Sequence, residues 1–422
     1  MRIAIDRSSG GIADGGSFQY ELIFLNALAE IATRFPAEFS FIVHPASNLF
    51  ALSVPGGLNY RGLQMRPLFE PVVQQHPPEA YATEPPPVPD ALDPNKPIFD
   101  ENVARAYRDA GIDFVLQLSP HYAPFVARTP FVVPIFDLNH RIQPEFPEVS
   151  AFGGIERREY IHINICRFAT FVLVDSEVGK EDVLRFYGQY IGEDRIRVLP
   201  YYPPIAQTPP PNAGQLAAVA AKYGLPKRFF FYPAQFWRHK NHELILRAAK
   251  LLLDQGEVVP FVFCGAYSDY FRARNFIELR TLASQLRVPI YYVGAVPAED
   301  VAALYCLSAG LVMPTFFGPT NIPPLEAWHY GRPVIASNIR GMREQIGDAG
   351  LLVDPRSPAD LASALLRLWK DDRLGAELAG RGKILLSAYS WPTYVESVVS
   401  LLTEACERVR AGSSPRFPAM PR

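Results

Sequence analysis

The strongest constraint on the fold is an alternation of short apolar runs with segments of helical period, and this alternation occurs twice along the chain. Buried strands are predicted in the first half at residues 2–6, 39–43, 114–117, 131–135, 171–174 and 196–199. Further strands are predicted in the second half at residues 228–232, 261–264, 290–293, 311–313 and 333–336. Strands that alternate with helices form βα units on a parallel sheet. The sequence therefore predicts an α/β protein with two Rossmann-like parallel-sheet domains.

A proline-rich segment near residue 205 is the predicted boundary between the two domains. Proline makes up 41 of the 422 residues, about twice its usual share. We expect a first domain at residues 1–204, which includes a proline-rich loop at residues 76–97, and a second domain at residues 205–390. Proline interrupts helices and sheet ladders, so these stretches predict loops and linkers.

The end of the chain is predicted to form one long helix and a free tail. Residues 391–411 carry an apolar stripe at helical spacing, which another surface has to cover. The stripe consists of Tyr394, Val398, Leu401, Ala405 and Val409. We expect this helix to cross back onto the first domain, and we expect residues 412–422 to form a flexible tail.

Charge and cysteine content exclude several classes of protein. The chain has 41 Lys and Arg, 43 Asp and Glu, a net charge of -2 and no basic stripe, so nucleic acid is not an expected partner. Its four cysteines are far apart, which argues against a zinc cluster and a disulfide framework. The N-terminus is charged too early for a secretory leader, and no apolar run is long enough to span a membrane. We expect a cytoplasmic protein whose membrane contact, if any, is peripheral at the inner face.

The loop at residues 316–327 has the features of an anion site. It follows a predicted strand and leads into a helix whose first turn contains two prolines. Proline is tolerated there because the first N–H groups of a helix have no partner within it. The free N–H groups around Asn321 and Ile322 are therefore predicted to point at a phosphate. Glu326 is a candidate for binding the hydroxyls of a ribose, and the alternative is that it only complements the helix dipole.

Several motifs in the second half occur in an order that is typical of one enzyme family. They are Val293-Gly294, Pro297-Ala298-Glu299, Leu304-Tyr305 and the segments at residues 318–327, 331–337 and 347–353. This series resembles the retaining nucleotide-sugar glycosyltransferases of family four, of the group-1 type. The match covers nearly all of the second half. The resemblance implies the GT-B architecture, in which two Rossmann-like domains face a central cleft.

The resemblance also implies a donor-binding role for residues that follow the first strand of the second domain. Family members grip the donor diphosphate there with an Arg and a Lys. Lys240 matches the Lys, whereas Gln235 stands in the place of the Arg. Arg238 is expected to supply the missing charge, because a guanidinium can bind a phosphate through two donors. The alternative is that residues 238–240 form an ordinary solvated basic turn.

A second departure from the family lies in the phosphate loop. Gly318 stands where the family has the first Glu of the loop, eight residues before Glu326. Thr320 and Asn321 are expected to replace that Glu as hydrogen-bond partners of the sugar or the phosphate, next to Ile322.

In the first domain, the resemblance points to two segments. Gly15 and Gly16 match the glycine pair ahead of the first helix, where glycine lets the backbone approach the donor phosphates or the acceptor. The alternative is a plain strand-to-helix turn, which would also contain glycine.

The second segment follows a predicted strand of the first domain. Many members have a His where this chain has Phe136. Asp137 and His140 are therefore the candidates for contacting the transferred sugar or the acceptor hydroxyl, a task that suits a neutral imidazole. The alternative for His140 is a histidine satisfied by a backbone carbonyl.

These residues predict a retaining glycosyltransferase that acts in polysaccharide biosynthesis. The expected reaction moves a hexose, with mannose or a deoxyhexose favoured, from a nucleotide diphosphate sugar to a hydroxyl of a glycan or lipid-linked glycan. The catalytic candidates are Asp137, His140, Arg238 and Lys240. No metal and no cofactor are expected, because the cationic groups would balance the charge of the diphosphate.

Three alternatives remain open from the sequence. The departures at Phe136, Gln235 and Gly318 are compatible with a catalytically degenerate binding protein. A nucleotide-sugar epimerase or hydrolase would use the same fold. A nicotinamide dehydrogenase is less favoured, because no G-x-G-x-x-G follows the first strand of either domain.

Overall fold

The structure of the chain is a computed structural model. It describes residues 1–6, 16–44, 77–81, 84, 92–120, 123–203 and 209–417. Gly15, residues 76, 82–83 and 85–91 of the proline-rich loop predicted at residues 76–97, and the predicted joint near residue 205 lie outside the described residues.

Two six-stranded parallel sheets form the framework, which confirms the predicted fold class. The first sheet has the order β2-β1-β3-β4-β5-β6. Its strands are β1 (Arg2–Asp6), β2 (Ser40–His44), β3 (Phe114–Gln117), β4 (Phe131–Pro134), β5 (Phe171–Val174) and β6 (Ile196–Val198). The second sheet has the order β12-β11-β10-β7-β8-β9. Its strands are β7 (Phe230–Pro233), β8 (Phe261–Cys264), β9 (Ile290–Tyr292), β10 (Gly310–Met313), β11 (Val334–Ser337) and β12 (Leu351–Val353).

Helices alternate with the strands in both halves, so that each half is a set of βα units. The helices of the first half are α1 (Gly16–Arg34), η3 (Pro78–Tyr81), α2 (Glu101–Asp109), α3 (Ala123–Val126), α4 (Asn139–Ile142), α5 (Pro147–Ser150), η4 (Ala151–Gly153), α6 (Gly154–Phe168), α7 (Glu177–Tyr187) and η5 (Glu193–Arg195). Those that follow are α8 (Ala213–Tyr223), η7 (Arg238–Lys240), α9 (His242–Asp254), α10 (Tyr270–Leu286), α11 (Ala298–Leu307), α12 (Ile322–His329), α13 (Met342–Ile346), α14 (Pro358–Lys370), α15 (Asp372–Leu386) and α16 (Trp391–Arg410).

Side chains on both faces of the first sheet are buried, because successive strand residues point to opposite faces. Ile3 and Ile5 of β1 pack into one core together with α1 and α16. Ala4, between them, packs into a second core together with α2 and α6. Helices on both faces thus explain why the strands read as continuous apolar runs.

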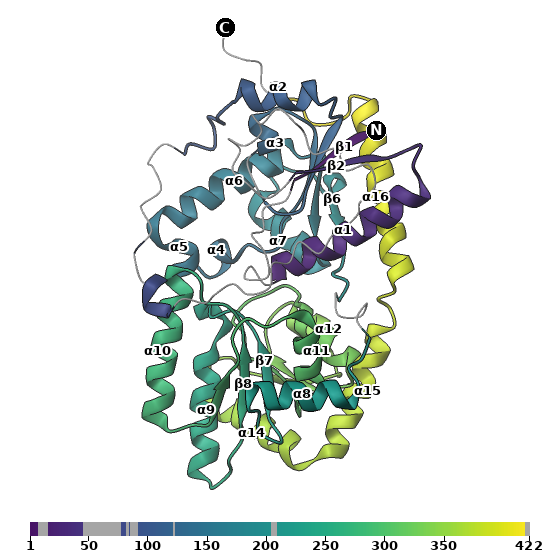
Figure 1. Cartoon of the computed structure of the whole chain (residues 1–422). Coiled ribbons are helices and arrows are strands. Elements are labelled where there is room, and N and C mark those ends of the chain that lie inside the picture. The colour runs from purple at the N-terminus through teal and green to yellow at the C-terminus, as the bar shows by residue number, and fades with distance from the viewer. Residues whose placement is uncertain are drawn as a thin grey trace.

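Helix α16 lies against the first half, although it follows the second half in sequence (Figure 1). Tyr394, Val398, Leu401 and Ala405 of the apolar stripe are buried in the core that also contains α1. Ser390 caps the helix by accepting a hydrogen bond from the N–H of Thr393. The stripe is therefore covered by the first half of the molecule.

The beginning of the predicted free tail is in contact with the first half. Phe417 stacks on Phe168 of α6, with ring centroids 5.0 Å apart. The hydroxyls of Ser414 and Thr170 are 3.0 Å apart. Residues 412–417 of the tail predicted to be flexible thus have contacts with the first half, and residues 418–422 lie outside the described part.

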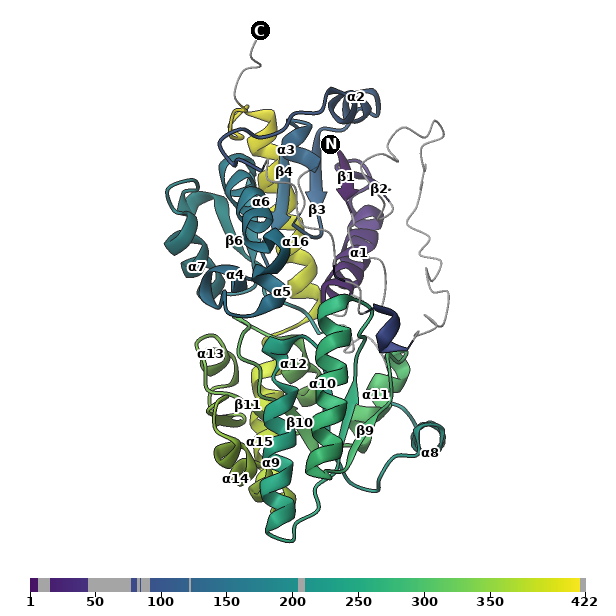
Figure 2. The ribbon, with the colours of Figure 1, turned by 90° about the vertical axis from the view of Figure 1, so that its left-hand side faces the viewer.

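The two halves are stacked, with α4 and α5 of the first half facing the second half (Figures 1 and 2). Polar contacts join them on both sides of the junction. Gln143 Nε2 donates to the carbonyl oxygen of Phe316 at 2.9 Å. Arg340, ahead of α13, forms an ion pair with Asp182 of α7 at 2.6 Å. These contacts fix how the ends of the two sheets face each other.

Candidate active site

A cleft of about 670 Å³ lies between the two halves, at the carboxyl ends of strands from both sheets. The first half contributes the beginning of α1 and the residues that follow β3 and β4. The second half contributes the residues that follow β7 and β10. Ligands of open α/β sheets bind at this end of the strands. The cleft is therefore the candidate active site.

Most of the residues predicted from the sequence line this cleft. They are Gly16, Asp137, Gln235, Lys240, Gly318, Thr320, Asn321 and Ile322. His140, Arg238 and Glu326 are described by the structure but do not line the cleft. Gly15 lies outside the described residues.

Lys240 and Asp137 face the cleft from opposite halves. Asp137 is exposed, and its Oδ1 accepts a hydrogen bond from the N–H of Asn139 at 3.0 Å. Burial lowers the pKa of Lys240, while the negative charge of Asp137 acts in the opposite direction. Within the described part of the chain, the Lys240 ammonium makes no ion pair. A half-buried cation of this kind is suited to an anionic ligand.

Arg238 is directed away from this cleft. This geometry does not agree with the prediction that Arg238 binds the donor diphosphate together with Lys240. Its guanidinium forms an ion pair with Glu278 of α10. It lines a separate cavity of about 450 Å³ beside α10. The physical reason is the 3₁₀ turn η7, in which successive side chains are about 120° apart, so that Arg238 and Lys240 point in different directions.

His140 is buried beside the cleft in a hydrogen-bond network of the first half. Its Nε2 lies 2.8 Å from Glu159 Oε1 and 3.1 Å from the hydroxyl of Tyr187. Burial would raise the pKa of Glu159, but hydrogen bonds from His140, Tyr187 and Arg141 lower it to about 2. With only 2% of its surface exposed, His140 has no direct access to a substrate in this conformation. Its partners are a carboxylate and a phenol rather than the backbone carbonyl considered above.

The phosphate loop is held by α13 and by the first half. The N–H of Asn321 donates to Gln345 Oε1 at 2.9 Å, and Gln345 Nε2 donates back to the Asn321 carbonyl at 2.7 Å. The Asn321 amide is therefore occupied, which corrects the prediction that it is free for a phosphate. The Thr320 hydroxyl donates to Asp175, which follows β5. Burial raises the pKa of Asp175 to about 6.

Backbone geometry explains the glycine at position 318. Gly318 has a φ of +140°, which L-residues rarely adopt. A Cβ at this position would lie 2.4 Å from Asn321 Nδ2. Any other residue at position 318 would require this backbone conformation and a shift of the Asn321 side chain, so glycine is favoured here.

Glu326 is buried in the second half and bonded to a tyrosine. Its Oε2 accepts a hydrogen bond from the hydroxyl of Tyr305 at 2.8 Å. Burial raises the pKa of Glu326 to about 7, although the Tyr305 bond acts to lower it. In this conformation the carboxylate does not reach the cleft, so a ribose contact would require the side chain to change rotamer.

The pKa of Glu326 predicts how it affects stability. Because its pKa is higher in the folded state than in the unfolded state, its stabilising contribution is complete below about pH 4.5 and is lost as the pH rises through about 7. Glu326→Gln removes this titration. We expect the melting temperature of Glu326→Gln, relative to that of the wild type, to rise between pH 5 and pH 8. A difference that stays constant over this range would contradict the assignment.

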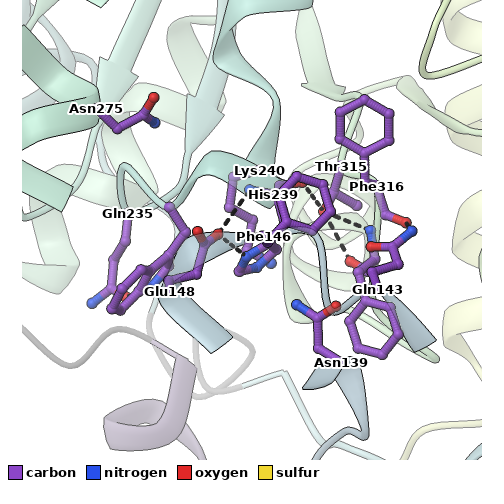
Figure 3. A network of polar contacts seen from close by, with 12 residues as sticks. Asn139, Gln143, Phe146, Glu148, Gln235, His239, Lys240, Asn275, Thr315 and Phe316 are labelled. Carbon is purple, nitrogen blue, oxygen red and sulfur yellow. Dashed lines mark hydrogen bonds and ion pairs between the residues drawn. The ribbon is translucent and has the colours of Figure 1, made fainter. Parts of the chain in front are cut away.

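His239 and Glu148 form a contact between the halves that sequence analysis did not identify. Glu148 Oε1 of α5 accepts hydrogen bonds from the backbone N–H of His239 at 3.0 Å and from its Nδ1 at 2.9 Å. Figure 3 shows this pair next to Lys240, with Phe146 beside the imidazole. Both residues line the cleft. The one sequence signal was the position of His239 directly before Lys240.

Among residues 1–6, 16–44, 77–81, 84, 92–120, 123–203 and 209–417, no group of three His, Cys, Asp or Glu side chains is arranged to hold a metal ion. None of the described helices is both long enough and apolar enough to cross a membrane.

Comparison with known proteins identifies the family. Residues 227–371 match the family described as Glycosyl transferases group 1. The O-antigen chain mannosyltransferase B of Escherichia coli is 35% identical over 273 residues, which are 61% of this chain and 70% of that protein. This chain is a group 1 glycosyltransferase. A more distant relative of the glycosyltransferase, the D-inositol 3-phosphate glycosyltransferase of Corynebacterium jeikeium, is 25% identical over 258 residues, which are 59% of this chain and 61% of that protein.

Solved structures agree with the fold of the glycosyltransferase. The Anabaena protein HepE, crystallised in complex with UDP, has a TM-score of 0.63 and 16% identity, and the match covers 96% of this chain and 100% of that one. Sucrose-phosphate synthase from Thermosynechococcus elongatus has a TM-score of 0.64 and 16% identity, and the match covers 96% of this chain and 98% of that one. These neighbours confirm the predicted GT-B architecture.

Proposed function

We propose that the protein is a retaining glycosyltransferase that moves a hexose from a nucleotide diphosphate sugar to a hydroxyl of a glycan or lipid-linked glycan in polysaccharide biosynthesis. The observation that carries the proposal is the cleft between the two sheets, in which Lys240 from one half faces Asp137 from the other. Mannose is the favoured hexose, because the Escherichia coli relative is named as a mannosyltransferase of the O-antigen chain. Deoxyhexoses remain the second choice.

Two side chains of the cleft can act in this reaction, Lys240 on the leaving diphosphate and Asp137 on the acceptor hydroxyl. The bond between the sugar and the diphosphate breaks, and negative charge develops on the leaving diphosphate. The ammonium of Lys240, half-buried and without an ion pair among the described residues, would stabilise that charge. The bond from the acceptor oxygen forms on the face that the diphosphate leaves, and the acceptor proton passes to the departing phosphate oxygen. Asp137 would orient the acceptor by accepting a hydrogen bond from its hydroxyl.

A nucleotide donor is supported by the fold neighbours and by the chemistry of the cleft. HepE was crystallised with UDP and with UDP-glucose. A cation next to a loop at the beginning of α12 is a suitable receptor for a diphosphate. We propose that neither a metal ion nor a cofactor takes part, since Lys240 can balance part of the charge that a divalent ion would otherwise balance.

Thermal unfolding in the presence of nucleotides tests the proposal first. UDP, GDP, ADP and dTDP are added separately, and a ligand at 100 times its Kd raises the free energy of unfolding by about 2.7 kcal/mol. We expect one nucleoside diphosphate to raise the melting temperature clearly more than the others. The corresponding nucleotide sugar is then incubated with glycan acceptors, and the anomeric configuration of the product is determined by NMR. A product of inverted configuration would contradict the retaining mechanism.

The metal requirement is a separate prediction. We expect transfer activity to be unchanged after dialysis against EDTA, because the proposed charge balance comes from Lys240. Initial rates before and after dialysis check this expectation. Loss of activity on chelation, with recovery on addition of magnesium, would contradict it.

A binding protein without catalytic activity is the second candidate. It is favoured by the positions of Phe136 and Gln235, which lack the family's histidine and arginine. Gln235 Oε1 instead accepts a hydrogen bond from Trp237 Nε1 at 2.7 Å, and Phe136 packs edge-on against Tyr20, with ring centroids 5.0 Å apart. Nucleotide binding without turnover, in the presence of a range of acceptors, would favour this candidate.

A further inference from the structure

The contact between His239 and Glu148 controls which ring nitrogen of His239 carries the proton. Glu148 belongs to the first half of the chain and has only 3% of its side chain exposed, while His239 has 14% exposed. One oxygen, Oε1 of Glu148, accepts both the backbone N–H and the Nδ1–H of His239. A carboxylate oxygen can only accept hydrogen bonds. Nδ1 is therefore the protonated nitrogen.

The remaining nitrogen, Nε2, is left with a lone pair. Burial lowers the pKa of His239, and the Glu148 carboxylate only partly offsets this effect. The ring is therefore neutral at pH 7, and a neutral imidazole with a proton on Nδ1 is an acceptor at Nε2. Nε2 has no hydrogen-bond partner among the described residues, and it is not one of the unpartnered polar atoms that are sealed from solvent.

The position of His239 places this lone pair at the centre of the proposed reaction. His239 directly precedes Lys240 and lines the same cleft. Asp137 of the opposite half is close enough to favour the protonated form of both residues. In a transfer reaction, the sugar lies between the leaving diphosphate and the acceptor. His239 lines the cleft beside Lys240 and within electrostatic reach of Asp137, so its ring is close to the position that the sugar would take.

The chemistry of Nε2 selects the kind of group that it can bind. Phosphate oxygens at neutral pH are acceptors and cannot pair with a lone pair, whereas a sugar hydroxyl can donate to it. We propose that His239 binds a hydroxyl of the transferred sugar through Nε2, and that Glu148 is the positioning residue that fixes its tautomer. This inference rests on the proposed function and adds a residue that recognises the sugar itself.

The other histidines near the cleft have different surroundings from those of His239. His140, the other candidate, is buried and bonded to Glu159. His162 also lines the cleft, but its Nδ1 bonds to the carbonyl oxygen of Arg158. His239 lines the cleft directly beside Lys240. Because Glu148 belongs to the first half, His239 is oriented for the sugar only when the two halves are in contact.

The test compares ligands that differ only in the sugar. Binding of GDP and GDP-mannose, and of UDP and UDP-glucose, is measured by calorimetry for the wild type and for variants with unchanged melting temperature. His239→Asn keeps a donor in the place of Nδ1 but removes Nε2. We expect it to bind the nucleotide sugar about 2- to 10-fold more weakly, as for the loss of one hydrogen bond, and to bind the nucleoside diphosphate as the wild type does.

Variants of Glu148 test the role of the tautomer. Glu148→Gln keeps an oxygen that can accept both N–H groups, and we expect nucleotide-sugar affinity within about twofold of the wild type. Glu148→Ala removes that oxygen and should weaken nucleotide-sugar binding as much as His239→Asn does, without an effect on the nucleoside diphosphate. Lys240→Ala serves as the comparison, because it should weaken both ligands of a pair.

Two results would overturn the inference. The first is that His239→Asn binds the nucleotide sugar and the nucleoside diphosphate with the same ratio of affinities as the wild type does. The second is an equal loss for the nucleoside diphosphate and the nucleotide sugar, which would place His239 at the phosphates or give it a purely structural role. Failure of the proposed function gives a different result, because a wild type that binds a nucleotide sugar without transferring its sugar would contradict the transferase, whereas the role of His239 is decided by the ratio of the two affinities.

Discussion

Lys240→Ala is expected to lower the rate of sugar transfer by about 100- to 1000-fold, the effect of removing one group that stabilises a developing negative charge. The side chain lines the cleft and is half-buried, and this burial lowers its pKa. A charge in such a place acts most strongly when the diphosphate departs. The loss should therefore appear mainly in kcat, with a smaller change in the affinity for the nucleotide.

Arg238→Ala is the matched control for this prediction. It removes a cation two residues away in the same turn, but Arg238 pairs with Glu278 outside the cleft. We expect its kcat to stay within about twofold of the wild type, because an exposed ion pair contributes little. Equal losses in the two variants would contradict the geometry described for η7. A wild-type rate in Lys240→Ala would place the site that stabilises the diphosphate elsewhere.

Gly341→Ala is expected to lower the free energy of unfolding by at least about 3 kcal/mol, because both backbone conformation and space exclude a side chain there. Gly341 precedes α13 with a φ of +87°, and a Cβ would lie 2.3 Å from the carbonyl oxygen of Pro319. Pro319 lines the cleft. The substitution should therefore displace the phosphate loop and abolish nucleotide binding under conditions in which the protein is still folded.

Gly224→Ala separates the two causes of this effect. Gly224 caps α8 with a φ of +59°, and a Cβ added there would have no atom of another residue within 4 Å among the described residues, its chain neighbours aside. Only the left-handed backbone is disfavoured, at a cost of about 1–2 kcal/mol. Urea unfolding of both variants and nucleotide titration of the folded proteins check the comparison. If Gly341→Ala is no less stable than Gly224→Ala and binds nucleotide normally, the close approach to Pro319 is not a constraint on the loop.

The order of strands and helices could be predicted from the sequence because both faces of each sheet are covered. Strands such as β3 and β8 are buried at every position, so that they are visible as continuous apolar runs between turns. Strand β12 was not predicted, because it is only three residues long and two of them are half-buried. Strand β9 is equally short and lies at the other edge of the sheet, yet it was predicted, so short edge strands are recognised less reliably than the central ones.

The polypeptide segments of the site could be predicted, but the directions of their side chains could not. Lys240 and Arg238 lie in one turn and have the same charge, yet only the three-dimensional turn decides which of them enters the cleft. The contact between Glu148 and His239 joins residues 91 positions apart in different halves. No periodicity within a single element contains that information, because it depends on how the two sheets face each other.

The most direct test of the central claim is a crystal structure of the protein in complex with the nucleoside diphosphate that stabilises it most. We expect the diphosphate to lie in the cleft between the two halves, with a phosphate oxygen in contact with Lys240 Nζ and the sugar position open toward Asp137 and His239. Arg238 should still be paired with Glu278. A nucleotide bound outside this cleft, or in it with Arg238 rather than Lys240 on the diphosphate, would contradict the account.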